Sequence, residues 1–192
     1  MTVDTNVISD ILALSAFEQK LTHEDRLTDE EKSYFQRCRD SKKALFVMLD
    51  FDVRKIGLRI VYKELLVRPP LHLLYKNLFT EEAKITKECR RLAERYVELA
   101  KIPAPDASIL ALASLNNIDV LLSWNREHIT NARTLAIITE INEKARIPTP
   151  EIITPRQFLD RIVRTDRKTF ALSPSPLLPV FRVDSYLAKH GV

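Results

Sequence analysis

The scarcity of glycine is the strongest constraint in this sequence. Only Gly57 and Gly191 occur among 192 residues. Phosphate-binding P-loops and dinucleotide fingerprints both need glycines at close spacing, so the sequence excludes these two kinds of site. Tight two-residue hairpin turns also favour glycine, so a sheet built from many hairpins is not expected. The sequence therefore predicts a helix-rich chain.

The composition is that of a globular protein, with 45% hydrophobic and 29% charged residues. The two cysteines, Cys38 and Cys89, form neither a disulfide framework nor a Cys-x-x-Cys zinc motif. Asp4 and Asp10 interrupt the only apolar stretch near the N-terminus, so no signal peptide is predicted. No run reaches the ~18 apolar residues of a membrane span. We therefore expect a cytoplasmic protein that does not enter the membrane.

The positive charge is concentrated at the C-terminal end of the chain. The net charge is +4. From Pro155 onward, seven basic side chains stand against three acidic ones, whereas the first 154 residues hold 23 of each sign. A basic segment of this kind attracts nucleic acid phosphates or forms a solvated helix, and the sequence leaves both interpretations open.

The apolar pattern predicts strands that alternate with helices. Strands are expected at residues 2–3, 58–62, 118–123 and 151–153. Helices are expected at residues 7–14, 28–49, 80–100, 106–116, 131–144 and 155–163, with a further helix from residue 63 that ends at Pro69-Pro70. Capping boxes open two of them, Thr28 with Glu31 and Thr154 with Gln157. This alternation predicts a parallel sheet covered on both faces, an α/β sandwich.

Polar residues follow the predicted strands. Asp4 ends the first strand, Glu64 follows the second by two residues, and Asn125 follows the third. Asp106 begins a helix that is expected to pack on the same sheet. Because ligands bind at the carboxyl ends of parallel strands, these side chains are expected to converge at one edge.

Such a cluster of carboxylates predicts a metal site. Clustered carboxylates repel one another unless a cation is present. Oxygen ligands without His or Cys select hard cations, here Mg²⁺ or Mn²⁺ rather than zinc. These ions activate water and stabilise negative charge on phosphate oxygens. The pattern therefore indicates metal-dependent phosphoryl chemistry.

Each of these residues also has a purely structural interpretation. Asp4 and Asn6 could form an Asx turn that caps the next helix. Glu64 and Asp106 could be acids in the first turn of a helix, where the helix dipole favours them. Asn125 could be an ordinary turn residue.

Four segments, in this order, resemble the PIN-domain nucleases. Residues 3–10 are similar to the opening motif of that family, and residues 102–113 to its third acidic motif. Residues 117–129 are similar to its fourth motif, and residues 152–155 to the end of the domain in VapC-like toxins. The resemblance covers residues 1–159, with a charged helical insertion at about 18–49. It leaves residues 160–192 as a basic, proline-containing tail.

The resemblance implies a three-layer α/β/α sandwich with a central, mostly parallel sheet. It also implies an endoribonuclease that hydrolyses RNA with Mg²⁺ or Mn²⁺. Asp4, Glu64 and Asp106 match the metal-binding acids of the family, and Asn125 takes its fourth catalytic position. Asn6 looks like the polar residue that supports the first aspartate. Toxin-type relatives pair with a small antitoxin and form homodimers, so both partners are expected here.

Two further residues near Asn125 are candidates for substrate binding, together with Asn6. Trp124 could stack on an RNA base, or it could anchor the loop beneath it. His128 could contact a substrate phosphate, or it could be a packing or surface histidine.

Two departures from the family pattern support an alternative function. Asn125 is neutral where many members of the family have aspartate, and only three residues precede Asp4. The alternative is a catalytically weak or inactive PIN scaffold that binds RNA or protein.

Overall fold

The computed structural model describes residues 1–21, 27–50, 54–125, 129 and 131–170. The chain divides into two compact units, Met1–Leu159 and Asp160–Val192. The strands are β1 (Thr2–Val3), β2 (Ile56–Gly57), β3 (Glu81–Glu82), β4 (Val120–Leu122) and β5 (Glu151–Ile153). The helices are α1 (Thr5–Leu21), α2 (Asp29–Asp50), α3 (Arg59–Leu65), α4 (Pro69–Leu78), α5 (Lys87–Arg95), the π-helical turn η1 (Tyr96–Ala100), α6 (Ala104–Leu115), α7 (Ala132–Ala145) and α8 (Pro155–Phe170).

A three-stranded parallel sheet joins segments that are far apart in the sequence. Its strand order is β1-β4-β5, and Val3 pairs with Leu122, which pairs in turn with Ile153. All three side chains are buried, as expected for short apolar strands covered by helices. The predicted helix-rich α/β fold with a small parallel sheet is confirmed, and the PIN-like three-layer sandwich stays a prediction.

The backbone continues the pairing of this sheet past the strand ends. The N–H of Asp4 donates to the carbonyl of Leu122 at 2.9 Å, and the N–H of Ser123 donates to the carbonyl of Ile153 at 3.1 Å. The carboxyl ends of β1 and β4 therefore meet at one edge of the sheet, and the residues that follow them are neighbours.

The strand predicted at residues 58–62 is wrong, because this segment is helical. The extended part is β2, and α3 begins at Arg59. The β-branched residues Ile60 and Val61 favour a strand locally. However, Leu58, Val61 and Leu65 recur at helical spacing, and all three are buried. Burial of this face against the rest of the molecule outweighs the local preference.

The helix predicted at residues 80–100 is replaced by three shorter elements. Thr80 is followed by β3, which pairs with β2 in parallel. The helix α5 starts only after Thr86, whose hydroxyl accepts a hydrogen bond from the N–H of Cys89 at 3.3 Å. Glu81 lies 2.8 Å from the guanidinium of Arg54, next to the small sheet. The capping residue is therefore Thr86 rather than Thr80.

The predicted capping boxes are both formed. At the start of α2, the N–H of Thr28 donates to Glu31 at 2.8 Å, and the N–H of Glu31 donates back to the Thr28 hydroxyl at 3.2 Å. Thr154 and Gln157 make the same pair of bonds at the start of α8, at 2.9 and 3.2 Å. The predicted break at Pro69 is also confirmed, since α4 begins at this proline.

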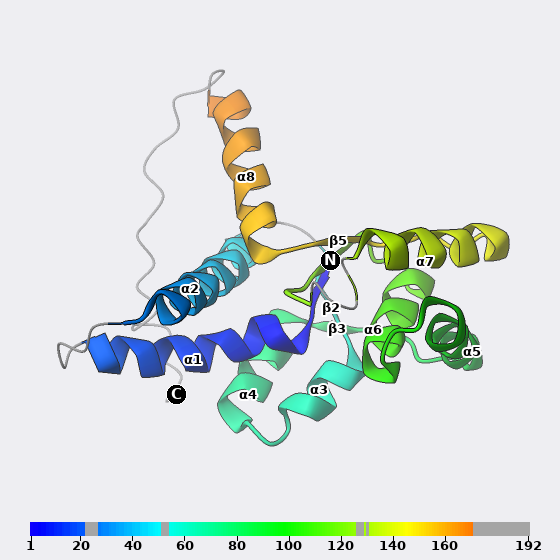
Figure 1. Cartoon of the computed structure of the whole chain (residues 1–192), viewed down its shortest axis with the longest axis horizontal. Helices are drawn as coiled ribbons and strands as arrows, with labels where there is room; N and C mark the ends of the chain where they lie inside the picture. Colours follow the sequence, from blue (N-terminus) through cyan, green and yellow to red (C-terminus); the bar gives the residue numbers. More distant parts are fainter. Residues whose placement is uncertain (22–26, 51–53, 126–128, 130, 171–192) are drawn as a thin grey trace. The chain divides into compact units, whose positions relative to one another are not determined.

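The helices pack in pairs around the sheet. In Figure 1, α1 runs beside α2, and α5 beside α6, in agreement with their contacts. The middle of α6, from Ala107 to Ser114, is almost entirely buried. Within the described residues, no helix has the length and apolar character needed to cross a membrane.

Candidate functional site

Asp4 is the buried centre of the candidate site. It follows β1 directly, and only 6% of its surface is exposed. Its Oδ2 atom accepts two side-chain hydrogen bonds, from the amide of Asn6 at 2.8 Å and from the hydroxyl of Ser123 at 2.7 Å. The parallel pairing of β1 with β4 makes the second bond possible, because it places residues 4 and 123 side by side.

A second aspartate is linked to Asp4 through the segment after β4. Asp106 lies in the first turn of α6, and the amide of Asn125 donates to its Oδ2 atom at 2.9 Å. The backbone N–H of Asn125 donates to the hydroxyl of Ser123 at 3.0 Å. A continuous series of hydrogen bonds therefore connects Asp106, Asn125, Ser123 and Asp4.

Glu64 reaches the same region from a different element than the sequence predicts. It lies in the last turn of α3, where its side chain is exposed, and not after a strand. The hydroxyl of Thr5 donates a hydrogen bond to its carboxylate. The predicted position after a strand is therefore wrong, and Glu64 lines the same pocket as Asp4 and Asp106 from a helix.

These residues line one open pocket of about 530 Å³. Its acidic side chains are Asp4, Asp10, Glu64 and Asp106, its cationic ones are Arg37 and Arg68, and its amides are Asn6 and Asn125. The guanidinium of Arg68 donates to the hydroxyl of Ser9 at 3.0 Å. The pocket thus combines four carboxylates with two arginines.

The carboxylates influence one another electrostatically. Burial is the main cause that raises the pKa of Asp4 above its ordinary value of 3.8. The negative charges of Asp106 and Glu64 raise this pKa further, whereas the hydrogen bonds from Ser123 and from the backbone of Thr5 lower it. The three carboxylates are thus close enough for repulsion, which a cation would relieve.

A buried network supports the segment after β4. The ring N–H of Trp124 donates to the hydroxyl of Ser41 at 2.7 Å, and this hydroxyl donates to Asp10 at 2.6 Å. Arg37 donates to Asp10 at 3.2 Å, and its guanidinium carbon lies 5.6 Å from the centre of the Trp124 ring. Burial raises the pKa of Asp10, and the bonds from Ser41 and Arg37 oppose this shift. The network fixes the two helices α1 and α2 to Trp124.

The three predicted substrate-binding residues have different surroundings. Trp124 is partly buried, and two hydrogen bonds hold it. Its ring N–H donates to Ser41, and its backbone N–H donates to the side-chain oxygen of Asn6 at 3.3 Å. This favours the anchor interpretation, and base stacking by Trp124 stays a prediction. Asn6 lines the pocket and bonds Asp4, so it is placed to position that carboxylate. His128 lies outside the described residues.

Ser123, which bonds Asp4, and the pocket residues Thr5 and Arg68 are not among the candidates predicted from the sequence. Ser123 does have a signal, because it ends a predicted strand beside Asp4. Thr5 and Arg68 have none, since their roles depend on side-chain contacts with partners 59 positions away.

The donor set fits a hard divalent cation better than it fits zinc. Carboxylate, hydroxyl and amide oxygens are the ligands that Mg²⁺ and Mn²⁺ prefer. Among the described residues, no cluster of three or more His, Cys, Asp or Glu side chains is arranged to hold a metal ion. Mg²⁺ is commonly held by only one or two carboxylates, and water and substrate phosphates complete its shell. Asp4 and Asp106 could provide such a pair.

Comparisons of this chain with protein-family models, with curated proteins and with solved structures find no match.

Proposed function

We propose that this chain is an endoribonuclease that depends on Mg²⁺ or Mn²⁺, with its active site in the pocket lined by Asp4, Glu64 and Asp106. The observation that carries this proposal is the convergence of the three carboxylates, which come from β1, α3 and α6, on one open pocket. Burial, and to a smaller extent the charges of Asp106 and Glu64, raise the pKa of Asp4, so its ionised form costs folding free energy that a bound cation would offset. The resemblance to PIN-domain nucleases supports RNA as the substrate.

In this proposal Asp4 and Asp106 hold the ion, and Glu64 lies close enough to join them. The bound ion supplies an activated water and neutralises the charge that develops on the phosphodiester. Ser123 and Asn6 orient the carboxylate of Asp4 through the hydrogen bonds to its Oδ2 atom. Arg68, on the wall of the same pocket, attracts the phosphate of the substrate.

The first test is cleavage of single-stranded RNA by the full chain with Mg²⁺, with Mn²⁺ and with chelator. We expect cleavage only with metal, and we expect Asp4→Asn and Asp106→Asn each to reduce the rate about 100-fold or more, because each removes an anionic ligand. Asp119→Asn is the matched control, since this aspartate is exposed and does not line the pocket. Equal rates for all four proteins would disprove the proposal.

A second candidate function is a scaffold that binds RNA without cutting it. The hydrogen bonds that already engage Asp106 and Glu64, together with the lack of a three-ligand cluster among the described residues, favour this candidate. RNA binding without cleavage in any divalent metal would support the scaffold over the nuclease.

The antitoxin and the homodimer stay predictions that depend on the resemblance. If the chain is a toxin, its expression should arrest growth, and Asp106→Asn should relieve that arrest. The oligomeric state is measured by light scattering on the purified chain.

A further inference from the structure

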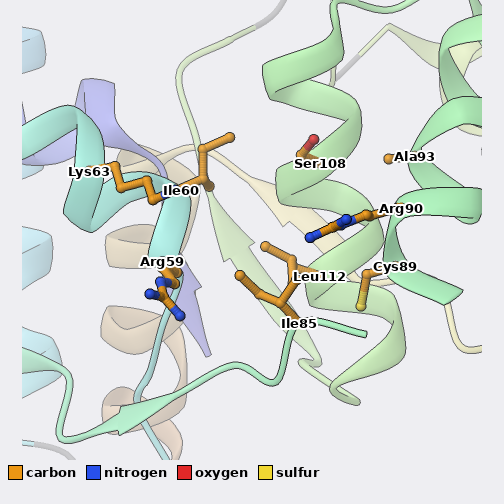
Figure 2. Close-up of a pocket in the computed structure, with 9 residues that line it drawn as sticks. All are labelled: Arg59, Ile60, Lys63, Ile85, Cys89, Arg90, Ala93, Ser108 and Leu112. Carbon is orange, nitrogen blue, oxygen red and sulfur yellow. The ribbon is translucent and has the colours of Figure 1, made fainter. Parts of the chain in front are cut away.

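A second pocket lies between α3, α5 and α6, and Figure 2 shows the side chains that line it. Its volume is about 250 Å³. The apolar side chains of Ile60, Ile85 and Leu112 face this space, and 45% of the surface of Ile85 is exposed. This pocket has no role in the chemistry proposed above.

The charged side chains around this pocket are all cationic. They are Arg59, Lys63 and Arg90, and no acidic residue is among those that line it. Arg59 lies 3.9 Å from the carboxylate of Glu82, which does not line the pocket. Within the part of the chain that the structure describes, Lys63 and Arg90 form no ion pair. In Figure 2, Arg90 extends from α5 toward α6, across the opening between the two helices.

The same two helices build this pocket and the carboxylate pocket. The helix α3 contributes Lys63 to the cationic pocket and Glu64 to the carboxylate pocket. The helix α6 contributes Ser108 to the first and Asp106 to the second. Residues one apart on a helix differ in direction by about 100° and residues two apart by about 200°, so the two pockets open on different faces of the same two helices.

We propose that the cationic pocket binds a backbone phosphate of the same single-stranded RNA whose scissile phosphate enters the carboxylate pocket, with the strand passing from one face of α3 and α6 to the other. This inference rests on the proposed function. It adds that the ligand of the cationic pocket is the RNA strand, and that a flanking nucleotide binds there. The cations hold the phosphate, and the apolar wall contacts the sugar or the face of the base.

The size of the pocket favours part of a polymer over a free small molecule. A volume of 250 Å³ lies below the range of roughly 300–1,000 Å³ that is typical of sites for whole small molecules. Phosphate contacts position a strand without reading its sequence. The pocket therefore favours RNA of any sequence, and its cations set the register of the strand over Asp4 and Asp106.

The test measures RNA binding separately from cleavage. A fluorescent single-stranded RNA of about 12 nucleotides is titrated with the full chain in EDTA, from about 0.05 to 0.2 M salt. The variants are Arg90→Gln, Lys63→Gln and, as matched control, Arg91→Gln, which removes an equally exposed arginine from the same helix but outside the pocket. Each pocket variant should weaken binding about fivefold at 0.1 M salt and reduce the salt slope by about 0.7, as expected for one lost phosphate contact. Arg91→Gln should change neither quantity.

The outcomes separate this inference from the proposed function. Equal effects of Arg90→Gln and Arg91→Gln, or binding of adenosine monophosphate as tight as that of the RNA, would overturn the inference even if the chain cleaves RNA. Selective loss of binding in the pocket variants would support it even if the chain cleaves nothing. Absence of RNA binding by the unaltered chain would overturn it as well.

Discussion

At the scale of single residues, Asp4 combines burial with two neighbouring negative charges. Only 6% of the surface of this residue is exposed, and the charges of Asp106 and Glu64 act on its carboxylate. Hydrogen bonds from Ser123 and Asn6 compensate for part of the lost hydration. Such a residue costs stability and is suited to binding a cation.

The raised pKa of Asp4 predicts how the stability of the folded chain changes with pH. Because the pKa of Asp4 is raised in the folded chain, the folded chain binds this proton more tightly than the unfolded chain does. The free energy of unfolding should therefore fall as pH rises from 3.8, the ordinary value, through the higher folded pKa. Asp4→Asn removes this loss of unfolding free energy. Without metal, the variant should therefore have a higher melting temperature than the parent protein at pH 7.

Thermal unfolding in EDTA, monitored by circular dichroism across this pH range, checks this prediction. The advantage of Asp4→Asn should disappear at pH values below 3.8, where the carboxylate is protonated in both states. Asp29→Asn is the control, because the side chain of Asp29 is 98% exposed. A variant that melts below the parent at pH 7 would contradict the prediction.

At the scale of elements, the start of α3 decides where Glu64 lies. The backbone N–H of Leu58, which precedes this helix, donates to the buried hydroxyl of Tyr75 on α4 at 2.8 Å. Gly57 is needed just before it, because a Cβ atom there would lie 2.8 Å from the ring of Tyr62. The turn from β2 into α3 therefore depends on contacts with α4 and with the helix itself.

Removal of the Tyr75 hydroxyl should destabilise this turn. Tyr75→Phe leaves the buried N–H of Leu58 without its partner, so the free energy of unfolding should fall by about 1–3 kcal/mol. Asp29→Asn, at a side chain that is 98% exposed, should change it by less than about 0.5 kcal/mol. Urea unfolding of both variants measures the difference, and equal midpoints would show that the bond contributes nothing.

The elements also show what the sequence can and cannot predict. The capping boxes at Thr28 and Thr154 were predictable because both partners lie within four residues. The helical state of residues 58–65 was not, because it depends on burial against distant parts of the chain. For the site, the approach of Asp4 to Asn125 follows from strand order, whereas the bond from Thr5 to Glu64 depends on a side-chain contact that no local pattern encodes.

At the scale of the whole molecule, a bound ion should stabilise the folded chain. The carboxylate pocket joins Asp4, the helices α1, α2, α3 and α6, and the segment after β4, so it exists only when these parts are assembled. An ion at 100 times its dissociation constant adds about 2.7 kcal/mol, or roughly 5–10 °C in Tm for a chain of this size. Melting with increasing Mn²⁺ measures this shift.

The double variant Asp4→Asn/Asp106→Asn is the control for this measurement. It should melt at a temperature that does not depend on Mn²⁺. An equal rise in the melting temperature of the double variant would mean that Mn²⁺ binds elsewhere on the chain.

The long sequence separation within the sheet has a consequence for synthesis. The hydroxyl of Ser123 and the carboxylate of Asp4 bond across 119 positions of the chain. At about 5–20 residues per second, a ribosome needs roughly 6–24 s to make the intervening stretch. During this time β1 lacks its partner strand β4, and the bond from Ser123 to Asp4 cannot form. If the proposed nuclease activity is correct, a growing chain cannot attack the message from which it is being translated until most of its length has emerged.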